Sequence, residues 1–164
     1  MNIGKVYKLK TGDAELKLKW EEDETGDVYD VTYHDAARPS LYEALQALVA
    51  PCCRYLDLPK TYGDDVIVSG VSFTWTNEIM GAVVTLQKPL ESCDAPLILN
   101  TPHGPVAPYA EGGMQLPEAM AKALTQVLAE AIDYINGERQ QMDLFNEAEK
   151  AGADEVTTAP FGSN

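Results

Sequence analysis

The sequence contains few of the residues that build metal centres and disulfide frameworks. It has three cysteines and two histidines in 164 residues. A structural zinc site takes four ligands at characteristic spacings, whereas Cys52 and Cys53 are adjacent and Cys93, His34 and His103 lie far from them in sequence. An odd number of cysteines also argues against a disulfide framework. We therefore predict that the three cysteines are reduced, buried thiols, with no metal and no cofactor.

Basic residues and long apolar runs are scarce as well. Lys and Arg number 12 against 26 Asp and Glu, which gives a formal net charge of −14. This charge repels phosphate backbones, so we expect no direct nucleic-acid binding, and it would suit a basic protein partner. No stretch approaches the about 18 apolar residues of a membrane helix, and the beginning, MNIGKVYKLK, has no apolar core of a secretory signal. We expect a cytoplasmic protein with no membrane contact.

The common signatures of catalysis are also missing. Neither G-x-x-x-x-G-K nor G-x-G-x-x-G occurs, which argues against the usual phosphate-binding loops. His34 precedes Asp35, and Ser40 is close by in sequence. Neighbouring residues of a strand point to opposite faces, however, so these three do not form an oriented nucleophile and base. We assign no catalytic residues and predict that the protein is not an enzyme.

Alternation of apolar and polar residues predicts β-strands, and so does enrichment in β-branched and aromatic residues. Six segments show one or both of these signals: 6–10, 14–20, 28–34, 65–75, 78–88 and 95–100. Turn residues at 11–13 and at 76–77 join two pairs of these segments into hairpins. Gly70 and Gly81 lie inside predicted strands, where a glycine indicates a bulge or the close approach of a neighbour.

Two helical patterns separate and follow these strands. The first begins near Ser40, which has with Glu43 the S-x-x-E spacing of a capping box. Pro51 lies within this pattern, so the helix either kinks there or gives way to a second short helix. Pro117 opens the other helix, whose apolar residues recur every three or four positions until residues 136–137 end it.

The order of these elements indicates the fold class. Three strands, a helix, two or three strands and a helix predict an α+β fold, in which an antiparallel sheet of five to six strands carries two helices on one face. We assign this domain to residues 1–137. Residues 138–164 contain six acidic and two basic residues. Because such a segment buries too little apolar surface to offset its ordering entropy, we predict a flexible acidic tail.

A loop rich in proline and glycine, residues 101–116, follows the predicted sixth strand. Its first part, NTPHGP, brings Asn100, Thr101 and His103 onto a bent segment near Tyr109. Loops on a rigid scaffold collect binding groups, so these four residues are candidates for a ligand site. The alternative is a proline-shaped connection across the sheet in which His103 is simply hydrogen-bonded.

Lysines and aromatic residues suggest a second candidate surface on the sheet. Five lysines gather in the first hairpin: Lys5, Lys8, Lys10, Lys17 and Lys19. Five aromatic residues fall in predicted strands: Trp20, Tyr29, Tyr33, Phe73 and Trp75. Together they could form a stacking platform for single-stranded nucleic acid. The simpler interpretation is that the lysines protect edge strands from aggregation.

The segment QMDLF, residues 141–145, resembles the linear motif by which bacterial DNA polymerases, repair enzymes and phage replication proteins dock on the sliding clamp. By this resemblance, Gln141 occupies a polar subsite, Met142 an intermediate contact, and Leu144 and Phe145 a hydrophobic pocket, while Asp143 holds the backbone shape. The family more often has Leu at the position of Met142. An extended peptide of this kind gains affinity from two apolar anchors and register from its glutamine amide.

Two other interpretations of this segment stay open at the level of the sequence. Met142, Leu144 and Phe145 could cover a gap in the domain's own core, as apolar C-terminal segments often do. They could also form a contact between two copies of the chain.

A second resemblance covers about two-thirds of the domain. The stretch VSGVSFTWTNEIMGAVVTLQKPLESCDAPLILNTPH, followed by YAEGG and YINGERQQMDLF, is similar to small uncharacterised proteins from the DNA-metabolism regions of temperate phages and prophages of Gram-positive bacteria. The resemblance favours a partner in DNA replication or recombination over a metabolic role, and with the missing catalytic signatures it leads us to expect a non-enzymatic accessory protein. The alternatives are a counter-defence protein that sequesters a host immune factor or small nucleotide signal, and, less favoured, a structural component.

Overall fold

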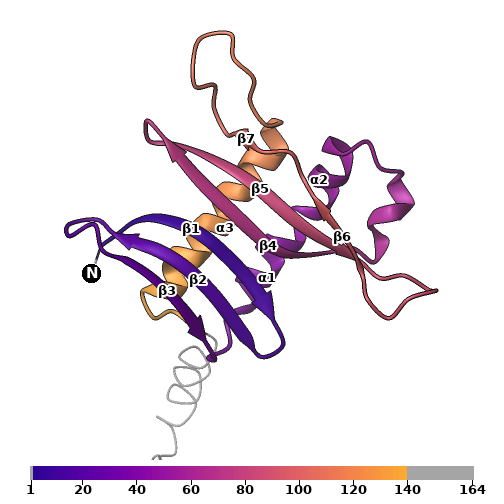
Figure 1. The fold of residues 1–164 in the computed structure, drawn as a ribbon, viewed down its shortest axis with the longest axis horizontal. Coiled ribbons are helices and arrows are strands. Elements are labelled where there is room, and N and C mark those ends of the chain that lie inside the picture. Colours follow the sequence, from indigo (N-terminus) through magenta and orange to yellow (C-terminus); the bar gives the residue numbers. More distant parts are fainter. Residues whose placement is uncertain (1, 140–164) are drawn as a thin grey trace, which may run out of the picture.

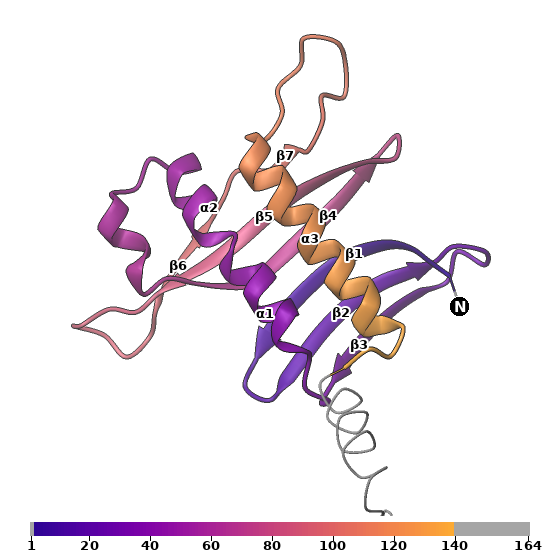
Figure 2. The ribbon, with the colours of Figure 1, turned by 180° about the vertical axis from the view of Figure 1, so that it is seen from behind.

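The computed structural model describes residues 2–139, which form an antiparallel sheet with helices packed on one face (Figures 1 and 2). The strands are β1 (Ile3–Gly12), β2 (Glu15–Glu22), β3 (Val28–Tyr33), β4 (Ile67–Thr76), β5 (Ile79–Lys88), β6 (Leu97–Asn100) and β7 (Gly104–Pro105). The helices are α1 (Pro39–Gln46), α2 (Val49–Tyr55) and α3 (Glu118–Ile135), with a 3-10 turn η1 (Lys60–Asp64). The predicted α+β class with an antiparallel sheet is confirmed.

The strand order differs from the order in sequence. It runs β3-β2-β1-β4-β5-β6, with β7 paired to β5 beyond the end of β6. The pairing of β1 with β4 joins the two hairpins into one sheet, so β1 and β2 lie inside it and β3 and β6 lie at its edges. The interpretation of the hairpin lysines as protection for edge strands is therefore wrong.

The core lies between the sheet and the helices. Every second residue of β2 faces this side, and Leu16, Leu18 and Trp20 are buried there. α3 contributes the stripe that its periodicity predicts: Met120, Leu124, Val127, Ala131 and Tyr134. Each large apolar side chain buried in this way stabilises the fold by about 1.5–3 kcal/mol. The opposite face of the sheet carries no helix (Figure 1).

Pro51 marks a helix break, as expected. Of the two alternatives, the structure has the second: α1 ends at Gln46 and a separate helix, α2, begins at Val49. Pro51 is the third residue of α2, where a backbone N–H has no intrahelical partner in any case, so the missing proline donor costs little.

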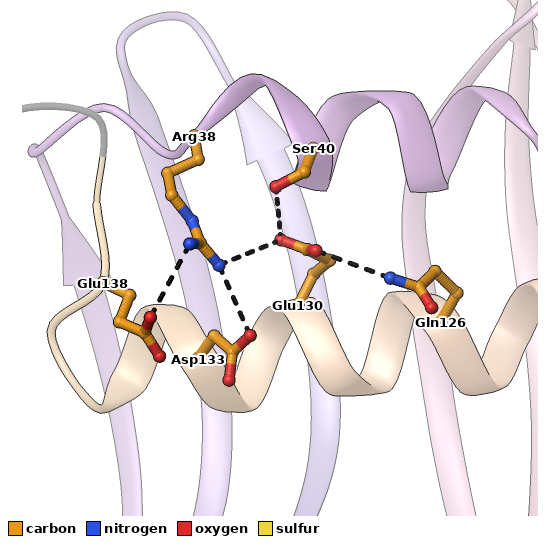
Figure 3. Close-up of polar contacts among 6 residues, drawn as sticks. All are labelled: Arg38, Ser40, Gln126, Glu130, Asp133 and Glu138. Carbon is orange, nitrogen blue, oxygen red and sulfur yellow. Dashed lines mark hydrogen bonds and ion pairs between the residues drawn. The ribbon is translucent and has the colours of Figure 1, made fainter. Parts of the chain in front are cut away.

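The capping box predicted at the start of α1 is not formed. Arg38 is the N-cap residue, and no side chain caps the helix. The hydroxyl of Ser40 donates instead to Glu130 of α3, with an Oγ–Oε1 distance of 2.8 Å (Figure 3). Glu130 is 8% exposed, and a buried carboxylate requires donors more strongly than a solvated helix end does. Ser40 therefore joins two helices and leaves Glu43 exposed.

Arg38 strengthens the same junction. Its guanidinium lies 3.7 Å from Glu130, 3.3 Å from Asp133 and 3.6 Å from Glu138 (Figure 3). The side chain is 24% exposed, so water screens these pairs only in part. The beginning of α1 and the end of α3 are thus held together by charge as well as by packing.

The turns and the inner glycines follow their sequence signals closely. The second hairpin turns at Asn77 and Glu78, one residue later than predicted, with φ values of 50° and 65° typical of a two-residue hairpin. Gly137 has φ 100° and ends α3, which confirms the predicted stop. A register shift lies between Val68 and Gly70, so the bulge expected there is present.

Candidate functional site

The segment Gln141–Phe145 lies outside the described residues. The three interpretations of it, a docking motif, a packed tail and a contact between two copies, therefore all concern residues that the structure does not describe. The last described residue, Arg139, is held firmly against the domain. Its guanidinium lies 2.8 Å from the carboxylate of Asp35 and 4.4 Å from the ring centre of Tyr134, and its Nε donates to the carbonyl of Tyr134 at 3.2 Å. Burial raises the pKa of Tyr134, whose hydroxyl donates to the carbonyl of Asp35. The sequence motif therefore begins two residues after a fixed point at the β3 end of the sheet.

The predicted ligand loop brings two of its four residues together. His103 Nε2 lies 2.7 Å from the hydroxyl of Thr74 on β4. Both atoms lie above Gly81 of β5, because a Cβ atom added to Gly81 would come within 2.6 Å of each and within 3.0 Å of the Tyr109 hydroxyl. Gly81 thus has the close neighbours that its place in a strand predicts. We call Thr74, His103 and Tyr109 the polar cluster.

The other two predicted residues have structural partners. Asn100 faces the same side of the sheet as the polar cluster, but its Oδ1 accepts the hydroxyl of Thr85 at 2.6 Å. Thr101 is 3% exposed, and its hydroxyl accepts the backbone N–H of Val84 at 2.9 Å. Thr101 therefore continues the β5–β6 pairing, and its side chain is not presented to a ligand.

The polar cluster suits binding better than covalent chemistry. A hydroxyl 2.7 Å from an imidazole has the distance of a nucleophile–base pair. Activation also needs a third group that orients the imidazole, and within residues 2–139 no side chain bonds the other ring nitrogen of His103. Thr74 and His103 are exposed, and Tyr109 is 41% exposed. The cluster can therefore exchange hydrogen bonds with a polar ligand and offer a ring to it.

Four lysines form a compact group on the face of the sheet that carries no helix. The β1–β2 register places Lys8 directly opposite Lys19 and Lys10 directly opposite Lys17. All four are exposed, and none has an ion pair within residues 2–139. We call them the four-lysine block. The sequence showed the lysines, but only the strand order shows that the block lies on central strands.

The four-lysine block is continuous with the polar cluster. Lys8 is paired with Ser72 of β4, and Thr74 follows Ser72 on the same face. Diagonal neighbours on a sheet lie about 7–8 Å apart, so Lys8 and Thr74 are within one long side chain of each other. The open face therefore carries one polar strip from the block to Tyr109.

The aromatic platform that we considered on this face is not present. The five aromatic residues lie on the helix side: Trp20 and Phe73 are 4% and 3% exposed. Trp20 stacks on Tyr29 at 4.6 Å, Tyr33 meets Tyr134 edge-on at 5.2 Å, and the indole of Trp75 donates to a backbone carbonyl. Successive residues of a strand face opposite sides, and the strand register places these aromatic side chains on the side opposite to the four lysines.

The prediction of buried, free thiols is confirmed for Cys52 and Cys53 and is wrong for Cys93, which is free but exposed. Burial raises the pKa of Cys52 to about 12, and it also raises the pKa of Cys53, so both stay protonated near neutral pH.

Among residues 2–139, no group of three His, Cys, Asp or Glu side chains is placed to hold a metal ion. Nor does this part of the chain contain a helix of the length and apolarity needed to cross a membrane. No protein-family model matches the chain, and comparisons with curated proteins and with solved structures found no match.

Proposed function

We propose that this chain is a phage-encoded, non-enzymatic accessory protein of DNA replication or recombination that docks on the bacterial sliding clamp through Gln141–Phe145. It would act in the cytoplasm of the bacterial host. The observation that carries the proposal is the position of the motif: QMDLF begins two residues after Arg139, where the chain is anchored to the domain. A short linear peptide must be tethered to a domain, and the anchored Arg139 supplies the tether for this one.

The packing of the domain supports this proposal over a packed tail. The apolar stripe of α3 already lies against the sheet and α1, and Tyr134 near its end contacts Tyr33 edge-on. Arg139 then covers both of these rings with its guanidinium, at 4.9 Å from Tyr33 and 4.4 Å from Tyr134. The Tyr33–Tyr134 contact is therefore covered by a charged side chain and not by an apolar one.

The expected affinity follows from the two apolar anchors. Burying Leu144 and Phe145 contributes about 1.5–3 kcal/mol each. Hydrogen bonds from Gln141 and shape contacts from Met142 add to this. Short linear peptides usually reach micromolar affinity, about −8 kcal/mol.

Calorimetric titration of purified clamp with the full chain tests the proposal. The wild type should bind with micromolar affinity, and Leu144→Ala with Phe145→Ala should abolish binding. Val156→Ala with Phe161→Ala is the matched control, because it also removes one aliphatic and one aromatic side chain from residues 138–164. Equal binding by the wild type and the motif variant would exclude the motif, and equal losses in both variants would exclude its specificity.

The polar cluster favours a second candidate function, a counter-defence protein that sequesters a small nucleotide signal. His103 and Tyr109 offer a hydrogen-bonding group and an exposed ring of the kind that nucleobases contact. A ligand that binds only the folded state raises its melting temperature by mass action. A panel of cyclic and linear dinucleotides in a thermal-shift assay should then contain one that stabilises the wild type but not His103→Ala. No shift with any of them would reject this candidate.

A further inference from the structure

We propose that the open face of the sheet binds the sugar–phosphate backbone of a single-stranded nucleic acid across the four-lysine block and the adjoining polar cluster. This inference goes beyond clamp docking, which uses residues 141–145 only. The net charge of −14 predicts no such binding. That expectation averages over the whole chain, however, while the fold separates four of its 12 cationic side chains onto one side of two central strands.

The arrangement of the block calls for an external anion. Two pairs of like charges directly opposite each other destabilise a sheet. Inside residues 2–139 no carboxylate forms an ion pair with Lys8, Lys10, Lys17 or Lys19. Protection of an edge does not explain them, because β1 and β2 are paired on both sides. A bound polyanion would turn this repulsion into attraction.

The neighbours of the block indicate a nucleic acid in preference to a protein. Ser72 lies opposite Lys8 and Thr32 lies opposite Lys17, so hydroxyl groups border the lysines. The centres of protein interfaces are depleted of lysine and rely on buried aromatic or apolar anchors, which these positions lack. Lysine, serine and threonine side chains are the usual partners of phosphate oxygens.

The borders of the block indicate a single strand in preference to a duplex. Neighbouring strands are about 4.8 Å apart, so the block is narrow. On its β3 side, Asp30 lies opposite Lys19, and an acidic turn at residues 23–27 joins β2 to β3. Two phosphate rows across a groove about 12 Å wide would bring one row over these carboxylates. One flexible strand can follow the lysines and place a base against the exposed ring of Tyr109.

Fluorescence anisotropy with a labelled oligothymidylate tests the proposal on the full chain. If four phosphates are neutralised, the plot of log K against log salt should have a slope of about −2.8, since each phosphate contributes about −0.7 for single strands. Lys8→Gln with Lys17→Gln removes one lysine from each like-charged pair and should halve this slope to about −1.4. Lys60→Gln with Lys122→Gln, in η1 and α3, is the matched control and should keep the wild-type slope.

Misfolding would not be confused with loss of binding. The block variant removes repulsion, so its melting temperature should equal or exceed that of the wild type. The clamp-motif variant Leu144→Ala with Phe145→Ala should bind the oligonucleotide normally, which separates this inference from the proposed function. No binding by the wild type at low salt, or equal slopes for both lysine variants, would overturn the proposal. Equally tight binding of duplex DNA, of poly-glutamate or of a mononucleotide would also overturn it, by assigning the face to a different anion.

Discussion

The Ser40–Glu130 hydrogen bond gives a stability prediction that distinguishes the observed contact between α1 and α3 from the capping box that the local sequence suggests. Ser40→Ala removes the shortest hydrogen bond of a carboxylate that is 8% exposed. The partners that remain are distant, since Arg38 lies 3.7 Å and Gln126 lies 3.5 Å from the carboxylate oxygens. Hydrogen bonds to charged groups contribute about 1.5–3 kcal/mol, so we expect a loss of about 2 kcal/mol in the free energy of unfolding.

Glu43→Ala is the contrasting variant. In a capping box, Ser40 and Glu43 would contribute together, and each substitution would cost about 1 kcal/mol. Glu43 is exposed and forms no such cap, so its replacement should stay within about 0.5 kcal/mol of the wild type.

Urea denaturation followed by circular dichroism measures both variants. A loss of about 2 kcal/mol for Ser40→Ala corresponds to a fall of about 4–8 °C in melting temperature for a domain of this size. In a double-mutant cycle, Ser40→Ala and Glu130→Gln should be coupled, whereas Ser40→Ala and Glu43→Ala should be additive. Equal losses for Ser40→Ala and Glu43→Ala, with no coupling to Glu130, would refute the reasoning and restore the capping box.

Three further predictions concern single sites. Trp20→Phe should lower the free energy of unfolding by about 1 kcal/mol or less, because the buried Nε1–H of Trp20 has no acceptor among residues 2–139. A truncation to alanine costs about 3–5 kcal/mol, and a loss for Trp20→Phe above about 1 kcal/mol in urea denaturation would contradict this. Gly81→Ala should lower the free energy of unfolding by about 1–3 kcal/mol and shift the NMR signals of the His103 ring, since the alanine methyl would meet two polar atoms at 2.6 Å. Unchanged His103 signals would show that the polar cluster does not lie above Gly81. At pH 8 maleimide should label Cys93 alone, because a pKa of about 12 leaves only about 10⁻⁴ of Cys52 as thiolate and burial also protects Cys53. Labels are counted by mass spectrometry, and three labels on the native protein would refute the burial of Cys52 and Cys53.

The elements that local sequence predicts well are those decided by nearby residues. Alternation over 14–20 places Leu16, Leu18 and Trp20 on one face whatever the strand pairs with, and the structure buries all three. The helix break at Pro51 and the stop at Gly137 depend on backbone chemistry within one turn, and both are found.

The errors at Ser40, at the hairpin lysines and at His103 involve partners that are distant in sequence. Ser40 finds Glu130, which is 90 residues away, so the spacing to Glu43 could not reveal its role. Strand order is likewise set by the pairing of β1 with β4, and without it the lysines of the first hairpin looked like residues of an edge. The sequence also could not show the partner of His103, because Thr74 and Gly81 lie in the β4–β5 hairpin and His103 lies in the loop after β6.

The most direct test of the clamp-docking account compares the full chain with a synthetic peptide of residues 138–150 in titrations of the purified sliding clamp. If the motif alone supplies the contacts, both should bind with micromolar affinities that agree within about threefold, or about 0.7 kcal/mol. Failure of the peptide to bind a clamp that the full chain binds, or failure of both, would contradict the account.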